Sequence, residues 1–182
     1  MMRNTKGSYG SVAKWMHWLI FFLVVLMLLS GYFSVIDIPH KMLGLAVLIL
    51  MVFRVIWALC NATPRLPPVL PKWQARMAHG VQWLLCISLI GMPLSGWIMA
   101  SAYGKPPHIA SLYLPAPFVS HNLALAGWCW KIHSTLAIVI LSFLGLHILA
   151  AGKHYFIDRD GIMQKMLPRC LIQLKPAGRK HQ

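Results

Sequence analysis

Four long apolar stretches dominate the pattern of hydrophobic and polar positions along the chain. Windows of about 20 apolar residues, enough to cross roughly 30 Å of hydrocarbon, fall at 13–36, 40–60, 77–100 and 128–152. The first two windows are joined by Asp37-Ile38-Pro39, a tight connection in which proline ends one helix and allows the next to begin. The pattern predicts an all-α fold, a transmembrane four-helix bundle that forms a single membrane domain.

The composition supports a lipid bilayer as the surroundings of this chain. Its 182 residues are 58% hydrophobic and only 11% charged, whereas a soluble domain is about 45–50% apolar and 25% charged. A formal charge of +14 would also suit nucleic acid, but the basic residues gather at the ends of apolar segments and form no nucleic-acid-binding motif. The four cysteines lie far apart without a CxxC pair, so neither a zinc site nor an iron–sulfur cluster is indicated.

The distribution of basic residues predicts the orientation in the membrane. Most lysines and arginines precede the first apolar segment, lie between the second and third, or follow the fourth. The opposite side holds Lys41, Lys105 and Lys131. Because positive charge is retained in the cytoplasm, both termini and the second loop are expected there. The basic residues within 153–182 predict a cytoplasmic tail near the lipid headgroups.

Two histidines in the fourth segment carry the candidate chemistry. His133 and His147 are fourteen residues apart (147 − 133), which on an α-helix is about 3.9 turns and roughly 21 Å, so both rings point to nearly the same face. His17 in the first segment and His40 in the second lie at matching depths. The spacing therefore predicts two level pairs, His17 with His147 on the cytoplasmic side and His40 with His133 on the outer side.

Two imidazoles from facing helices can bind one haem iron from opposite sides, so the two level pairs predict two haems as cofactors. Three glycines near the histidines would leave room for the rings: Gly31, Gly44 and Gly145. Gly31 lies fourteen residues after His17 (31 − 17), which leaves bare backbone at the depth of the outer haem. Hydrogen bonds between helices for the histidines, and close helix packing for the glycines, remain as alternatives.

Other polar residues in or beside the segments are candidates for supporting roles. Arg54 lies fourteen residues after His40 (54 − 40), at the level of the inner pair, where its guanidinium would suit a haem propionate; the alternative is snorkelling to the interface. His79 and His154 lie near the cytoplasmic side. Both are candidates for a supporting role at a ligand or for a substrate site. Their alternative role is that of ordinary interfacial side chains.

Several motifs, in this order and spacing, carry a resemblance to a known family. They are Tyr9-Gly-Ser-Val-Ala-Lys-Trp-Met-His17-Trp18, His40-Lys-Met-Leu-Gly44, Arg54-Val-Ile-Trp57, Pro93-Leu-Ser-Gly-Trp97, Tyr103-Gly-Lys-Pro106, Ile132-His133, Leu146-His147 and Lys153-His-Tyr-Phe-Ile-Asp-Arg-Asp160. With them the chain resembles the bacterial cytochrome b561 family, four-span proteins of the inner membrane with two b-type haems. The resemblance implies haem ligation by His17, His40, His133 and His147.

The resemblance also implies an activity class, electron transfer between a periplasmic-side redox partner and the membrane quinone pool. Some members of the family resemble superoxide oxidases, which oxidise superoxide and reduce ubiquinone. The resemblance therefore suggests this oxidoreductase activity for the present chain. If a quinone binds, Arg54, His79 and His154 are the candidates for its site, since quinone reduction consumes protons that histidine can relay. Many relatives carry a second histidine near the position of His79, where this chain has Gln82. Two alternatives stay open: a haem-bearing membrane anchor of a separate periplasmic dehydrogenase, and a metal transporter. A transporter is disfavoured because all three acidic residues lie outside the apolar centres.

Overall fold

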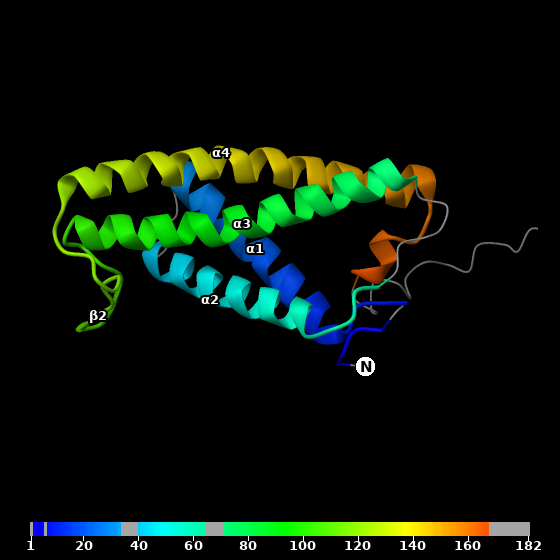
Figure 1. Cartoon of the computed structure of the whole chain (residues 1–182), viewed down its shortest axis with the longest axis horizontal. Helices are drawn as coiled ribbons and strands as arrows, with labels where there is room; N and C mark the ends of the chain where they lie inside the picture. Colours follow the sequence, from blue (N-terminus) through cyan, green and yellow to red (C-terminus); the bar gives the residue numbers. More distant parts are fainter. Residues whose placement is uncertain (1, 6, 34–39, 65–70, 168–182) are drawn as a thin grey trace, which may run out of the picture.

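The computed structural model describes residues 2–5, 7–33, 40–64 and 71–167 of the chain (Figure 1). Within them, four long helices are present: α1 (Ser11–Phe33), α2 (His40–Leu59), α3 (Lys72–Ala102) and α4 (Leu123–Lys153). Each of these helices is long and apolar enough to cross a membrane. The predicted all-α architecture with four apolar helices packed together is confirmed. The orientation of the termini remains a prediction.

The helices α3 and α4 both begin five residues earlier than the apolar windows predicted (77 − 72 and 128 − 123). The start of α4 is fixed by Asn122, whose side-chain oxygen accepts a hydrogen bond from the backbone N–H of Leu125 at 3.0 Å. Such a cap satisfies an N–H that has no partner within the helix. Pro71, directly before α3, has no N–H to lose and suits the start of a helix. Hydropathy located the apolar cores of these helices, but local capping chemistry decided where they begin.

The four helices do not pack equally against one another. Along the long axis of the molecule, α4 lies beside α3, α3 packs on α2, and α2 packs on α1 (Figure 1). By contrast, α1 and α2 approach α4 much less closely with their backbones. Helix α4 is therefore held in the bundle mainly by its packing against α3.

The centre of the bundle is a cluster of buried apolar side chains from three helices. Its fully buried members are Ile20, Val24, Leu28, Val47, Met51 and Ile140. Many other large apolar side chains point outward, as Phe22, Ile49 and Leu149 do. A helix that is apolar on all faces is typical of a membrane span, so these outward side chains are in the position expected for contact with lipid.

One end of the bundle, here called the hairpin end, is covered by the connection between α3 and α4. Two short antiparallel strands lie in this connection, β1 (His108–Ile109) and β2 (Leu112–Tyr113). Trp97 donates its indole N–H to the carbonyl of Leu114 at 2.8 Å, and Ser101 accepts a hydrogen bond from the backbone N–H of Ala116 at 2.8 Å. The long third loop is therefore fastened to α3.

The opposite end, here called the terminal end, holds the N-terminal segment, a π-helical turn η1 (His154–Asp158) and a 3₁₀ turn η2 (Met163–Lys165) (Figure 1). Lys14 donates to the carbonyl of Leu167 at 2.9 Å, and the indole N–H of Trp18 donates to the carbonyl of Met166 at 3.1 Å. These bonds hold the segment after α4 against α1. The predicted tail beyond residue 167 lies outside the described residues, as does the Asp37-Ile38-Pro39 connection.

Candidate cofactor site: two histidine pairs

The four histidines of the predicted pairs lie in two groups at different heights in the bundle. The ring centres of His40 on α2 and His133 on α4 are 6.3 Å apart, with 67° between the ring planes. The ring centres of His17 on α1 and His147 on α4 are 6.2 Å apart, also at 67°. We call these the hairpin-end pair and the terminal-end pair. The structure thus brings together the same residues that helical spacing grouped.

The spacing within each pair fits a metal ion between two imidazoles. An iron–nitrogen bond of about 2.0 Å, as imidazole makes with zinc, plus about 1.1 Å from nitrogen to ring centre, places two opposite rings about 6.2 Å apart. Within the described residues, no hydrogen bond joins the two rings of either pair. Both pairs also bridge helices whose backbones stay apart.

Hydrogen bonds fix the orientation of the hairpin-end rings. The Nδ1 atom of His133 lies 2.9 Å from the carbonyl oxygen of Met92 and 3.3 Å from the hydroxyl oxygen of Ser95. A carbonyl can only accept, so Nδ1 of His133 carries the proton and donates it. The other ring nitrogen, Nε2, then has a free lone pair, which is the form of histidine that binds a metal.

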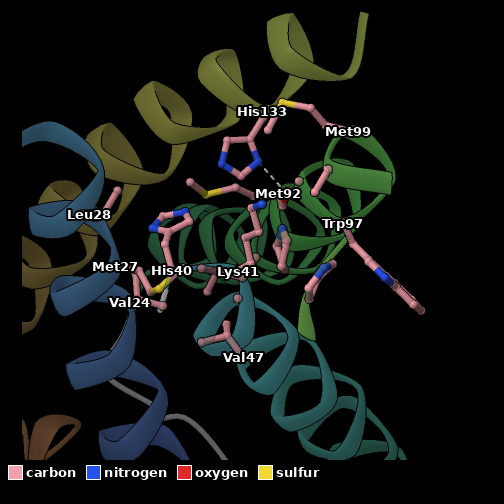
Figure 2. Close-up of a pocket in the computed structure, with 16 residues that line it drawn as sticks. Val24, Met27, Leu28, His40, Lys41, Val47, Met92, Trp97, Met99 and His133 are labelled. Atoms are coloured by element: carbon pink, nitrogen blue, oxygen red, sulfur yellow. Dashed lines mark hydrogen bonds between the residues drawn. The ribbon is translucent and has the colours of Figure 1, made fainter. Parts of the chain in front are cut away.

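A cavity of about 230 Å³ adjoins the hairpin-end pair. Figure 2 shows His40 and His133 projecting into it, with side chains of α1, α2 and α3 around them. Nearly all of the lining is apolar; Val24, Leu28, Val47 and Met92 are examples. Apolar walls and two imidazoles suit an apolar cofactor that binds through a metal.

The glycines around the hairpin-end pair differ in how closely an added side chain would approach it. A Cβ added at Gly31 would lie 3.8 Å from the ring of His40, and one added at Gly44 would lie 3.6 Å from the side chain of Met27, both ordinary van der Waals contacts. Gly145, in contrast, faces open space. The closest approach involves a glycine that sequence reasoning did not single out: a Cβ at Gly96 would lie 2.9 Å from Cε1 of His133.

Two donors near the terminal-end pair have no hydrogen-bond acceptor among the described residues. Arg54 interacts electrostatically with both His17 and His147, yet within the described residues its guanidinium makes no hydrogen bond or ion pair. Trp57, one turn further along α2, has a buried indole N–H with no acceptor. A buried donor without a partner is costly, and sequence reasoning had placed Trp57 only in an interfacial aromatic belt. Together the two side chains offer charge and hydrogen bonds to a carboxylate such as a haem propionate.

Tyr9, directly before α1, extends the polar group at the terminal end. Burial raises the pKa of its hydroxyl, and the positive charge of Arg54 opposes this shift. The phenol is therefore neutral at physiological pH. Since a neutral phenol is both donor and acceptor, Tyr9 does not neutralise the guanidinium of Arg54, which keeps its full charge for a bound anion.

An apolar layer separates the two histidine levels. Val24, Val47 and Ile140 each follow a pair histidine of their own helix by seven residues (24 − 17, 47 − 40 and 140 − 133), halfway to the other level. All three belong to the buried core cluster. The two levels are roughly 21 Å apart along α4, with these buried apolar side chains between them.

The two additional histidine candidates have different surroundings. His79 is exposed on α3, and within the described residues it makes no hydrogen bond, ion pair or ring contact. His154 is partly buried, with Nδ1 2.6 Å from a carboxylate oxygen of Asp160 and 3.2 Å from one of Asp158. Sequence reasoning selected His154 but missed both aspartates, whose positions depend on the π-helical turn and on the left-handed backbone of Arg159 (φ 52°).

Comparison with known proteins gives the family. Residues 8–169 match the family model described as prokaryotic cytochrome b561. The chain belongs to the prokaryotic cytochrome b561 family. As a member of this family, the protein is a membrane cytochrome of the b type that takes part in electron transport. Its four long apolar helices agree with a position in the membrane.

Individual relatives cover nearly the whole chain. It is 28% identical to cytochrome b561 homolog 2 of Escherichia coli (strain K12), with 90% of this chain and 93% of the relative covered. It is 26% identical to the protein of Yersinia pestis named "Probable superoxide oxidase CybB", with 89% and 97% covered. Cytochrome b561 homolog 1 of Escherichia coli (strain K12) is also 26% identical, with 90% and 98% covered. This b561-family chain therefore matches its relatives over nearly their full length.

Proposed function

We propose that this b561-family protein binds two haems b, one between His40 and His133 and one between His17 and His147, and carries electrons along the bundle. The equal spacing of the two ring pairs, 6.3 and 6.2 Å, is the observation that carries the proposal. Two different pairs of helices produce the same separation, and it is the separation that an iron bound from both sides requires. A lone histidine that merely packs in a bundle needs no such partner.

When bound, haem b supplies the one-electron chemistry, and the protein supplies its binding and surroundings. The hydrogen bond from His133 to the carbonyl of Met92 holds one ring in place at the hairpin end. The layer containing Ile140, only 1% exposed, keeps water out between the levels. Arg54 and Trp57 are the residues proposed to bind a propionate at the terminal end.

We place the hairpin end on the periplasmic side, because most basic residues lie toward the other end. Superoxide is the electron donor that the name of the Yersinia pestis relative suggests. Positive charge at the hairpin end supports an anionic substrate: Lys41 lines the cavity beside His40, and its ammonium group donates to the carbonyl of Lys105 at 2.8 Å.

Quinone is the proposed acceptor at the terminal end. Two superoxide anions lose two electrons and become two O₂, while a quinone takes up those electrons and two protons to form the quinol. His154, with Asp158 and Asp160 around its Nδ1 atom, is the group proposed to deliver protons from the cytoplasmic side. His79 is exposed and is therefore a weaker candidate for this role.

A second candidate function is that of a haem-bearing anchor for a separate periplasmic dehydrogenase. It is favoured by the exposed apolar side chains of the hairpin connection, among them Ile109, Leu112 and Tyr113, which could pack against a soluble partner. A stoichiometric soluble dehydrogenase that co-purifies with the protein would support this function. Reduction of the purified protein by superoxide, without any partner, would favour the first.

The haem assignment is tested by a reduced-minus-oxidised spectrum and the haem-to-protein ratio for single alanine variants of the four histidines. We expect His17→Ala and His147→Ala to lose the same spectral component, and His40→Ala and His133→Ala to lose the other. His108→Ala, in the exposed hairpin, is the control and should keep both. Loss of one component by variants from different pairs, or two haems in every variant, would contradict the ligand assignment.

A further inference from the structure

We infer that Ser30 is a positioning residue that lowers the reduction potential of the hairpin-end haem by accepting a hydrogen bond from its ligand His40. This inference rests on the proposed ligation by His40 and His133. Both proposed haem sites have two histidine ligands, so the ligands themselves do not make the two sites differ. The difference lies in what the outward ring nitrogens contact.

The hydroxyl of Ser30 lies between two groups. Its oxygen is 2.9 Å from the carbonyl of Met27, to which it donates, and 3.1 Å from Nδ1 of His40. A hydroxyl has a single proton but two lone pairs. Because that proton is directed at Met27, the oxygen accepts from Nδ1–H of His40, which leaves Nε2 of His40 as the metal-binding nitrogen.

His133 has an equivalent arrangement built by α3, a helix that supplies no proposed ligand. Its Nδ1–H faces the carbonyl of Met92 at 2.9 Å and the hydroxyl of Ser95 at 3.3 Å. Ser95 is buried, and its own proton goes to the Met92 carbonyl at 2.7 Å. Both ligands of the hairpin-end pair therefore donate to oxygen atoms of neighbouring groups.

The terminal-end pair lacks this feature. Within the described residues, neither His17 nor His147 makes a hydrogen bond; His17 has an edge contact with Trp18, with ring centres 5.8 Å apart. The positive charge of Arg54 lies near both rings instead. The two levels thus have the same ligands but different electrostatic surroundings.

A hydrogen bond donated by the distal nitrogen makes a ligating imidazole a stronger electron donor. A stronger donor stabilises ferric iron more than ferrous iron and so lowers the reduction potential, one of the means by which proteins tune a haem. The cation near the terminal-end pair acts in the opposite direction, because it disfavours the additional positive charge of the ferric state. The hydrogen bond from His40 to Ser30 therefore lowers the potential of the hairpin-end haem, which favours electron flow from there toward the terminal end.

The test is a spectroscopic redox titration of purified haem-loaded variants at Ser30, with both haems followed separately by their optical bands and by electron paramagnetic resonance. Ser30→Ala removes the acceptor and should raise the potential of the hairpin-end haem alone. Ser30→Cys, with sulfur as a weak acceptor, should give a smaller rise. Ser30→Thr keeps the hydroxyl and should restore the wild-type value.

Two further variants separate the hydrogen bond from general packing. Ser95→Ala should change the hairpin-end potential less than Ser30→Ala, because His133 still donates to the carbonyl of Met92. Ser142→Ala is the matched control, since this exposed serine of α4 donates to the carbonyl of Ile138 in its own helix and has no other hydrogen bond in the described part of the chain. It should change neither potential.

An unchanged hairpin-end potential in Ser30→Ala, or an equal rise at both haems, would overturn the inference. If Ser30→Ala does not accumulate in membranes, the difference between Ser30→Cys and Ser30→Thr decides, and equal potentials for these two would also overturn it. Failure of the proposed function would be distinguishable: wild-type protein would then hold no haem, or would keep both haems when His40 or His133 is replaced.

Discussion

Gly96→Ala provides a sharp test of the hairpin-end site, because the change is one methyl group at the point of closest approach. A Cβ at this position would lie 2.9 Å from Cε1 and 3.1 Å from Nδ1 of His133. Ordinary contacts begin near 3.4 Å, so the ring would have to move by about 0.5 Å (3.4 − 2.9) to make one. The hydrogen bond to the carbonyl of Met92 restrains that movement, and the ring belongs to a proposed ligand.

The magnitude follows from the cost of overpacking. Forcing an additional methyl group into a packed region costs about 1–3 kcal/mol. Strain that falls on the haem-bound state would weaken haem retention at the hairpin end about 5–150-fold. The terminal-end haem, whose ligands do not contact Gly96, should be retained at wild-type occupancy.

The assay is the haem-to-protein ratio and the reduced-minus-oxidised spectrum during stepwise removal of haem by a competing haem-binding protein. Gly80→Ala is the matched control: it lies on the same helix, and a Cβ there meets nothing within 4 Å. Replacing glycine by alanine stabilises the helix by about 1 kcal/mol in both variants. The difference in haem loss between the two variants therefore reports the contact with His133. If Gly96→Ala and Gly80→Ala lose haem at equal rates, the proposed position of His133 beside the haem is wrong.

Two further predictions concern the terminal end. Arg54→Gln should weaken haem retention there about 10–150-fold, the equivalent of one charged hydrogen bond of about 1.5–3 kcal/mol, while the hairpin-end component stays intact; loss of the hairpin-end component instead would refute this placement of Arg54. His154→Gln should slow the reoxidation of reduced haem by added ubiquinone and leave both haem spectra unchanged. Reoxidation at the wild-type rate, measured by stopped-flow absorbance, would remove His154 from the proton path.

The sequence determined the helices and the grouping of the histidines. Apolar runs long enough to cross a membrane leave the backbone no alternative to a helix in lipid, so hydropathy located all four segments. The rise and pitch of a helix are constant, so fourteen residues between His133 and His147 fixed two levels on one face of α4 before any packing was known. The hydropathy pattern did not locate the starts of α3 and α4. These depend on Pro71 and on the cap formed by Asn122.

The tertiary structure decided what surrounds the histidines. Gly96 and the carbonyl of Met92 belong to α3, which carries none of the four paired histidines, and no periodicity within α4 indicates which residues of α3 face His133. That register is set by side-chain packing between two helices, a contact distant in sequence and without a local signal. The same holds for Ser30 beside His40 and for the unpartnered indole of Trp57. Spacing along one helix is a property of the chain, whereas the contacts that tune each site exist only once the helices have packed.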